Sequence, residues 1–447
     1  MAFPHILPAP AAQVWHLSQQ LAQFERMSAP QQRSIQAQSL RTLYAWAAEY
    51  SPFWRERLEA VHWTRDSDPW AVLAGLPSLT RADVQENFDA LSCAKALEPD
   101  SCSVAHSTGS TGRPVAVQRH GPTYHLRYAA HSLRGTIWHQ LDVSRPLLKF
   151  GVRLHDGTSP DWGGPEAWFA KTGPVVRRRS IARDISELYE PIKTLHPGYI
   201  VGMASTAQTL ARYALENYGA DLPRIAAVLT TGETVTDQMR RECQAAFGAR
   251  VINRYSNVEV GWMAMQCTKH EHLHVMAANV IIEIVDEAGQ PCAAGQPGRV
   301  LVTALHSQAM PLIRYDVGDV AEWGEPCDCG IELPVLRRIW GRQREFVRVP
   351  TGELRFFAVA AEEFLAIAPI RDIRFRYYTN PLLRCEVVCT APLTAEQRAA
   401  LTARVRQMLG FECPVEIEQR DAIDWGATDK RASFLVMEAP WTGGASS

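Results

Sequence analysis

A run of hydroxyl and glycine residues is the strongest candidate for chemistry in this sequence of 447 residues. Its four hydroxyl residues and two glycines occupy six successive positions: Ser107, Thr108, Gly109, Ser110, Thr111 and Gly112. Glycine lets a backbone approach an anion closely, successive amides can form a nest for phosphate oxygens, and hydroxyl groups add donors. The run lacks the Gly-Lys-Ser/Thr ending of a Walker loop. Taken alone, it is either a phosphate-binding loop or a polar surface loop.

Further polar motifs follow this loop along the chain. They are Thr230-Thr231-Gly232-Glu233, Tyr255-Ser256-Asn257-Val258-Glu259, Arg314-Tyr315-Asp316-Val317-Gly318-Asp319, Gly341-Arg342 and Asp429-Lys430-Arg431. In order and spacing, the loop and these motifs resemble the adenylate-forming superfamily of acyl-CoA synthetases, adenylation domains and luciferases. The phrase Ala-Met-Pro-Leu-Ile-Arg-Tyr at 309–315 and the Tyr-x-x-x-Glu-Val form at 255–260 resemble the phenylacetate–CoA ligase group and its capsular-biosynthesis relatives.

The resemblance implies that the protein uses ATP and Mg²⁺. Residues 107–112 would cradle the β- and γ-phosphates, and Glu259 would hold Mg²⁺ against them. Tyr255 would stack on adenine and is followed by Ser256 in the same nucleotide-binding motif, while Gly232 and Glu233 would line the adenine slot. A surface carboxylate and a core tyrosine are the alternatives for Glu259 and Tyr255.

The same resemblance implies roles for three residues nearer the C-terminus. Asp319 would accept hydrogen bonds from both ribose hydroxyls, which a carboxylate with two oxygens can do. Arg342 would contact this ribose from the hinge side. Lys430 would bridge the α-phosphate and the substrate carboxylate, and with Glu259 it is the expected catalytic residue. A turn and a solvated surface lysine are the alternatives for Asp319 and Lys430.

Several positions depart from the superfamily pattern. Ser256 stands where the superfamily usually has Gly, and Val258 stands where it usually has Ser or Thr before the Glu. The hinge reads Gly-Arg-Gln-Arg-Glu at 341–345 in place of Gly-Arg-x-Asp-Asp, so Arg344 replaces an acid. Asp429 stands where Gly usually precedes the lysine. These departures leave open how ATP is held and how the second half-reaction proceeds.

A separate group of cysteines and histidines has the ligand types of a zinc site. The sequence carries Cys267-x2-His270-x-His272-x-His274 and, later, Cys327-x-Cys329-Gly330. We expect a closed structural set of Cys267, His272 or His274, Cys327 and Cys329, as in similar arrangements of the resembling group. The alternative is reduced thiols and exposed histidines.

The acyl side of the predicted site is carried by a glycine-containing segment. Residues 196–205 resemble the segment that runs along the acyl pocket in this group. The expected pocket residues are Tyr199, Gly202, Met203, Ala204, Thr231 and Trp262. A flat apolar slot favours an aryl acid or another small organic acid, and buried core is the alternative for Tyr199.

These motifs need rigid elements to position them. Apolar residues recur at three- and four-residue steps in the first 95 residues, which predicts helices. Strand–helix–strand alternation at 100–270 predicts α/β layers, and strands dominate at 279–340. We expect an α/β fold in which 1–341 bind ATP and acid and 342–447 form a small mobile α+β cap.

Composition excludes other classes of protein. The 46 Lys and Arg residues nearly balance 48 Asp and Glu, for a net charge of −2, so no basic excess indicates a nucleic-acid binder. Ten cysteines are too few for a disulfide scaffold, and neither a signal peptide nor a membrane span is visible. We expect a cytoplasmic protein without membrane or nucleic-acid partners; whether it forms a homodimer is left open.

The sequence thus predicts an ATP-dependent enzyme that converts a small carboxylic acid to an acyl-adenylate and passes the acyl group to CoA or another thiol. Transfer to an amine or a carrier protein, transfer of AMP to an acceptor, and a non-catalytic nucleotide-binding homologue remain alternatives. Neither the acid nor the acyl acceptor follows from the sequence.

Overall fold

The structure is a computed structural model. It describes residues 7–107, 114–151, 154–180, 184–219, 221–342, 346–348, 354–356, 364, 366–378, 382–409, 411–424 and 434–437. The chain divides into two compact units, Met1–Ile339 and Trp340–Ser447. No helix in these residues is long and apolar enough to cross a membrane.

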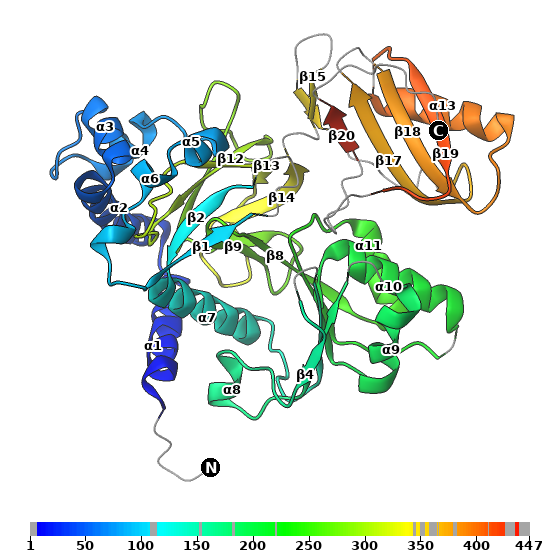
Figure 1. The fold of residues 1–447 in the computed structure, drawn as a ribbon, viewed down its shortest axis with the longest axis horizontal. Coiled ribbons are helices and arrows are strands. Elements are labelled where there is room, and N and C mark those ends of the chain that lie inside the picture. Colours follow the sequence, from blue (N-terminus) through cyan, green and yellow to red (C-terminus); the bar gives the residue numbers. More distant parts are fainter. Residues whose placement is uncertain are drawn as a thin grey trace. The chain divides into compact units, whose positions relative to one another are not determined.

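Helices dominate the start of the N-terminal unit (Figure 1). They are α1 (Ala9–Phe24), α2 (Ala29–Tyr50), α3 (Pro52–Ala60), α4 (Pro69–Gly75), α5 (Arg81–Glu86) and α6 (Phe88–Leu91), with the 3₁₀ turn η1 (Ala94–Ala96). A capping box starts α5: Thr80 Oγ1 accepts from the Asp83 amide at 3.0 Å, and Asp83 Oδ2 accepts from the Thr80 amide at 2.8 Å. The Thr-x-x-Asp pattern therefore fixes where this helix begins.

A twelve-stranded sheet forms the middle of the N-terminal unit. Its strands are β3 (Leu147–Gly151), β4 (Gly157–Ser159), β5 (Val175–Arg179), β6 (Tyr199–Gly202), β7 (Ala227–Thr231), β8 (Arg250–Asn257), β9 (Gly261–Gln266), β10 (Leu273–Val275), β11 (Val280–Val285), β12 (Gly298–Ala304), β13 (Tyr315–Trp323) and β14 (Val335–Arg342). The order is β11-β12-β13-β14-β10-β9-β8-β7-β6-β3-β5-β4. Neighbours from β5 to β8 are parallel, and β8 to β9 begins an antiparallel half.

Helices cover both halves of this sheet. They are α7 (Gly121–Trp138), α8 (Glu166–Phe169), α9 (Ile185–Leu195), α10 (Ala204–Asn217) and α11 (Asp237–Phe247). The apolar sides of α9, α10 and α11 pack on one face of the parallel strands, around Ile200 and Val228 (Figure 1). The alternate residues Tyr199 and Ala227 belong to a separate core on the other face, as the two-residue strand period requires. The predicted α/β class is confirmed.

The helix α7 directly follows a small antiparallel sheet of β1 (Cys102–His106) and β2 (Ala116–His120). Pro122 in its first turn suits a helix start, because proline lacks only an amide that would have no partner there. At the other end, Glu25 accepts hydrogen bonds from Arg134 Nε at 3.0 Å and Trp138 Nε1 at 2.9 Å. The C-terminal part of α7 is therefore held beside the end of α1.

The C-terminal unit has its own core. Its elements are β15 (Phe346–Arg348), β16 (Leu354–Phe356), β17 (Ile370–Tyr378), β18 (Leu382–Cys389), α13 (Ala395–Leu409), β19 (Val415–Arg420) and β20 (Phe434–Met437). The order β19-β18-β17-β20 forms a mixed sheet, and α13 packs Leu401 and Val405 against Phe375 and Leu383. Within the sheet, Glu386 is buried and accepts from Arg374 Nε at 2.6 Å.

Candidate active site

The base of the hydroxyl- and glycine-rich loop is closed by Ser107. The Ser107 amide donates to the Val115 carbonyl at 2.8 Å, and the Val115 amide donates to Ser107 Oγ at 2.9 Å. Arg81 Nη2 also donates to Ser107 Oγ, at 3.4 Å. The predicted phosphate-binding residues Thr108, Gly109, Ser110, Thr111 and Gly112 lie outside the described residues. What the structure gives for this motif is therefore its location between β1 and β2 and the fixed position of Ser107.

The turn between β8 and β9 carries Glu259. Asn257 Oδ1 accepts from the Val260 amide at 2.7 Å, and Arg119 of β2 donates through Nη2 to the Val258 carbonyl. The turn is thus tied to the strand that follows the loop. Glu259 itself is half-buried and makes no hydrogen bond or ion pair with the residues that the structure describes. Its carboxylate remains available for a ligand.

Two predicted nucleotide-binding residues contact each other. The Tyr255 hydroxyl donates to Asp319 Oδ2 at 2.7 Å, and both side chains are buried. Asp319 lies on β13 after Gly318, whose φ of 75° is one that glycine adopts without strain. The structure therefore brings together the residues expected at adenine and at ribose.

The hydroxyl of Ser256 has a partner on the neighbouring strand. Thr231 Oγ1 and Ser256 Oγ lie 3.0 Å apart, across the parallel pair β7–β8. After Thr231 the chain turns at Gly232, which has a φ of 82°. Glu233 then accepts from the Ser205 amide at 2.7 Å and from Ser205 Oγ at 3.0 Å. Its carboxylate thus binds the first turn of α10, where negative charge is favourable.

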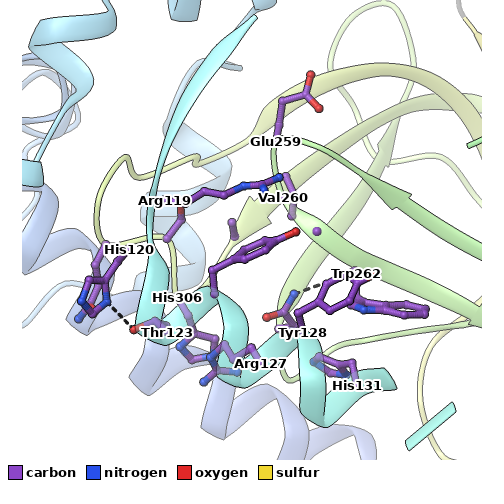
Figure 2. Close-up of a pocket in the computed structure, with 16 residues that line it drawn as sticks. Arg119, His120, Thr123, Arg127, Tyr128, His131, Glu259, Val260, Trp262 and His306 are labelled. Atoms are coloured by element: carbon purple, nitrogen blue, oxygen red, sulfur yellow. Dashed lines mark hydrogen bonds between the residues drawn. The ribbon is translucent and has the colours of Figure 1, made fainter. Parts of the chain in front are cut away.

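A pocket of about 550 Å³, part of it open to solvent, lies between β2, α7 and the β8–β9 turn (Figure 2). Figure 2 shows Glu259 and Arg119 toward one end, and Arg127, His131 and His306 toward the other. The pocket thus extends from the candidate Mg²⁺ ligand to a group of basic side chains.

Some polar side chains of this pocket are occupied by protein partners. The Arg119 guanidinium donates to Val258 and lies over the Tyr124 ring, with 4.1 Å from Cζ to the ring centroid. His306 Nε2 lies 3.0 Å from the Ala278 carbonyl. By contrast, Arg127 makes no hydrogen bond or ion pair within the described part of the chain.

The histidines at this end of the pocket are neutral. Burial lowers the pKa of His131 to about 3, and the charges of Arg127, His306 and Arg134 add to the effect. Burial and the charge of Arg127 likewise lower the pKa of His306 to about 3. Burial alone lowers the pKa of Arg127 to about 10, so its guanidinium is still charged near pH 7.

The residues predicted to form the acyl pocket do not all lie together. Trp262 lines the pocket described above. Tyr199 is in the sheet core, and its hydroxyl accepts from the Asp142 amide at 2.8 Å. Gly202 ends β6, Met203 caps α10, and Ala204 is the first residue of α10. These residues line the parallel half of the sheet near Thr231 and Glu233.

Two site residues are predicted in the C-terminal unit, and the structure describes one of them, Arg342. Arg342 is the last residue of β14 and is half-buried, and Gly341 before it has a φ of 135°. Lys430 lies outside the described residues, as does the departure at Arg344. Their approach to a nucleotide stays a prediction.

The cysteine and histidine segments meet in the N-terminal unit. Ligand atoms of Cys267, His274, Cys327 and Cys329 all lie within 4.8 Å of one another. The two closest contacts are Cys267 Sγ to Cys327 Sγ at 3.7 Å and Cys329 Sγ to His274 Nε2 at 3.2 Å. His272 is outside this set, although its ring packs edge-on against His274. We call these four residues the Cys₃His cluster.

The Cys₃His cluster fits a tetrahedral zinc ion. With Zn–S bonds of about 2.3 Å, two sulfurs of a tetrahedron lie about 3.8 Å apart. His274 Nδ1 faces the Leu333 carbonyl at 3.3 Å, which orients the ring so that Nε2 points at the thiols. The Lys269 amide donates to Cys267 Sγ at 3.4 Å. Four ligands of these types leave no open position for a substrate, which is typical of a structural site.

Comparison with known proteins adds relatives to this geometry. A phenylacetate–coenzyme A ligase of Thermus thermophilus is 24% identical over 330 residues, which are 69% of this chain and 70% of that ligase. The chain is a relative of the phenylacetate–CoA ligases. The chain is also similar to protein CapK of Staphylococcus aureus, at 27% identity over 165 residues, which are 35% of this chain and 34% of CapK. No protein-family model matches the chain.

Solved structures of CoA ligases have the same fold as this chain. A 2-hydroxyisobutyryl-CoA ligase, in the postadenylation state with 2-HIB-AMP, has a TM-score of 0.74 at 19% identity, covering 93% of this chain and 92% of the ligase. The same ligase with 2-HIB-AMP and CoA, in the thioesterification state, has a TM-score of 0.61 at 20% identity, covering 93% of this chain and 91% of the ligase. Together with the sequence similarity to phenylacetate–coenzyme A ligases, this shared fold confirms the recognition of the adenylate-forming superfamily from sequence.

Sequence reasoning missed most of the pocket. Thr123, Arg127 and His131 recur at four-residue steps on α7, so they lie on one face of the helix. Three polar residues at this spacing, in a helix that begins soon after the hydroxyl-rich loop, could have indicated that this helix face lines a binding pocket. His306 gave no such signal, since only the fold brings the segment after β12 to α7.

Proposed function

We propose that the protein is an ATP-dependent, AMP-forming acid–thiol ligase. It joins a small carboxylic acid to AMP with release of pyrophosphate, then passes the acyl group to the thiol of CoA. Relatives named phenylacetate–coenzyme A ligase support this activity, as does the fold shared with a CoA ligase whose solved structures hold an acyl-AMP and CoA.

The observation that carries the proposal is the uncommitted carboxylate of Glu259. Asn257 closes its turn, Arg119 ties the turn to β2, the strand that follows the hydroxyl-rich loop in the sequence, and Glu259 lines the pocket. This is where a metal-bound triphosphate must meet an acid. Mg²⁺ bound by Glu259 would neutralise charge on the phosphates as the acid attacks.

The protein's own residues supply position and charge. Asp319 would orient the ribose, with its carboxylate held by the Tyr255 hydroxyl. Ser107 and the rest of the loop would hold the phosphates. Lys430 would stabilise the charge that develops between the substrate carboxylate and the α-phosphorus, because a positioned cation is worth most where charge appears. The reaction needs no protein nucleophile, since the acid carboxylate attacks directly.

Two further features belong to the proposal. We propose that the Cys₃His cluster holds a structural zinc ion that joins the β9–β10 connection to the segment before β14. We also propose that the enzyme acts in the cytoplasm, on an aryl or other small organic acid.

The test is ATP–pyrophosphate exchange over a panel of carboxylic acids, followed by detection of the acyl-CoA. We expect exchange with at least one acid class and a loss of 1,000-fold or more in Lys430→Ala, because a transition-state charge partner is removed. Lys193→Ala is the matched control, since that lysine is exposed, lies outside the pocket and pairs with Glu190 on the same helix. Normal exchange in Lys430→Ala, or no exchange with any acid in folded protein that binds ATP, contradicts the proposal.

A further inference from the structure

The pocket contains polar groups without a partner among the described residues. His131 is only 3% exposed, and its Nε2 has no hydrogen-bond partner in the part of the chain that the structure describes. Trp262 is 5% exposed, and its Nε1 likewise has none. Arg127 shares this end of the pocket with His131 and has neither a hydrogen bond nor an ion pair among the described residues.

Arg127 is half-buried beside this pocket, so its guanidinium has lost part of its contact with water and gains from a ligand of opposite charge. A charge removed from water costs several kcal/mol unless it is paired or hydrogen-bonded. Glu259 is the sole carboxylate among the described residues that line this pocket, and Figure 2 shows it at the opposite end with its carboxylate directed away. Arg127 therefore has a vacant hydrogen-bonding fork, the geometry that carboxylates match.

Aromatic rings line the space between the two ends. The rings of Tyr124 and Tyr128 are stacked with centroids 5.9 Å apart, and Tyr128 lies 5.8 Å from Trp262. Flat apolar walls of this kind suit an aromatic ring. A ligand with an anion at one end and a ring in its middle would match both features.

From these contacts we propose that the acid is an aromatic acid carrying a second carboxylate, and that Arg127 binds this second carboxylate. The inference rests on the proposed ligase function, because it assigns the reacting carboxylate to the Glu259 end. The ring then lies among Tyr124, Tyr128 and Trp262, and the far carboxylate meets the guanidinium of Arg127. Arg127 is a specificity residue in this arrangement, and it takes no part in bond making.

The test compares acids that differ only in the second charge. The probes are isophthalate, terephthalate and 3-carboxyphenylacetate, each paired with the analogue in which one ring carboxylate is replaced by methyl. We expect at least one diacid to bind tenfold or more tightly than its methyl analogue by calorimetry, and to have the higher kcat/KM in pyrophosphate exchange. Arg127→Met should lower binding and kcat/KM for the diacid 10- to 100-fold, the range for a charge-assisted contact. The methyl analogue should change by less than twofold.

Three controls separate this role from others. Arg127→Lys should recover part of the preference, because it keeps the charge and loses the fork. The thermal midpoint of Arg127→Met should equal or exceed that of the wild type, since the arginine holds no protein group. Arg41→Met removes an exposed arginine charge from α2 and should change neither preference nor binding.

Several results would overturn the inference. Wild-type protein that binds every methyl analogue as well as its diacid has no second-carboxylate site. Equal losses for both members of a pair, or a loss confined to the KM of ATP or CoA, would assign Arg127 to another part of the reaction. If methyl analogues support exchange and diacids do not, the ligase function stands and this inference fails. If no acid supports exchange, the ligase function fails, while calorimetry still decides whether Arg127 selects a diacid.

Discussion

The pocket and the Cys₃His cluster belong to the same unit but differ in whether their polar side chains have partners within the protein. In the cluster, three thiols and an imidazole are brought within 4.8 Å by segments about sixty residues apart in sequence. In the pocket, the Arg127 guanidinium, the buried His131 Nε2 and the buried Trp262 Nε1 have no hydrogen-bond partner among the described residues. Both regions are built beside β9, so the difference does not come from their depth in the fold.

This difference indicates that the cluster has a structural role and that the pocket has a ligand-binding role. Groups that converge on one point can bind an ion that holds two segments together, and this energy goes into the fold. Polar groups that line a pocket without protein partners contribute little to the stability of the fold, and a ligand that pairs with them gains binding energy. Changes in the cluster should therefore alter stability, and changes in the pocket should alter binding.

The largest effect that sharpens this contrast is loss of the proposed zinc. Cys327→Ser should lower the free energy of unfolding by roughly 3 kcal/mol or more, because a metal site that binds only the folded state contributes its binding energy to folding. Metal analysis of purified protein should give about one zinc per chain for wild type and much less for the variant. Pyrophosphate exchange per folded molecule should change by less than about twofold.

The control is Cys292→Ser, a buried thiol outside the cluster. It should leave the zinc content unchanged. A wild-type protein with less than about 0.2 zinc per chain in chelator-free buffer, or a Cys327→Ser variant as stable as wild type, would show that the thiols form no metal site.

The fold could be predicted where one local pattern decides the outcome. The Thr80–Asp83 cap, the α11 helix and the β11 strand lie where hydroxyl spacing and apolar periodicity put them. The cluster could be predicted as a set of four ligands, but the choice between His272 and His274 depends on ring directions across β10. The sequence does not contain those directions.

The pocket could not be predicted in the same way. Arg127 and His131 belong to α7, while His306 follows β12 and Glu259 follows β8. Only tertiary packing brings four such segments together. Glu233 is a second example, since its two bonds to Ser205 depend on how β7 and α10 end beside each other.

An intermediate effect concerns the acid sensitivity of the pocket. Burial and nearby charges lower the pKa of His131 from 6.5 to about 3, so the unfolded chain takes up a proton first as pH falls. The contribution of His131 to stability is complete above pH 6.5 and is lost as pH falls toward 3. At pH 5 the loss is about 2 kcal/mol, from about 1.4 kcal/mol per pH unit. Urea unfolding should therefore show that the free energy of unfolding of His131→Gln falls by about 2 kcal/mol less than that of wild type between pH 7 and pH 5.

A second buried histidine tests whether the pocket is special. Burial and the charge of Arg250 lower the pKa of His139 to about 4, and His139 does not line the pocket. His139→Gln should reduce the acid sensitivity in the same direction. A diacid bound at Arg127 should make His131 easier to protonate and should leave His139 unchanged. Added diacid should therefore reduce the fall in the free energy of unfolding between pH 7 and pH 5 in His139→Gln, which retains His131, but not in His131→Gln. An equal diacid effect in both variants would remove the distinction between the two sites.

The smallest effect comes from a pair that combines both kinds of region. The Tyr255 hydroxyl satisfies Asp319 within the protein, yet Asp319 is also the residue expected to bind the ribose. Tyr255→Phe should lower the free energy of unfolding by about 1 kcal/mol, because a buried carboxylate loses a donor. Ribose hydroxyls can replace this donor, so saturating ATP should reduce the difference in thermal midpoint between variant and wild type. If the difference in thermal midpoint is the same with and without ATP, Asp319 does not contact the nucleotide, and the Tyr255–Asp319 bond is structural in the same sense as the Cys₃His cluster.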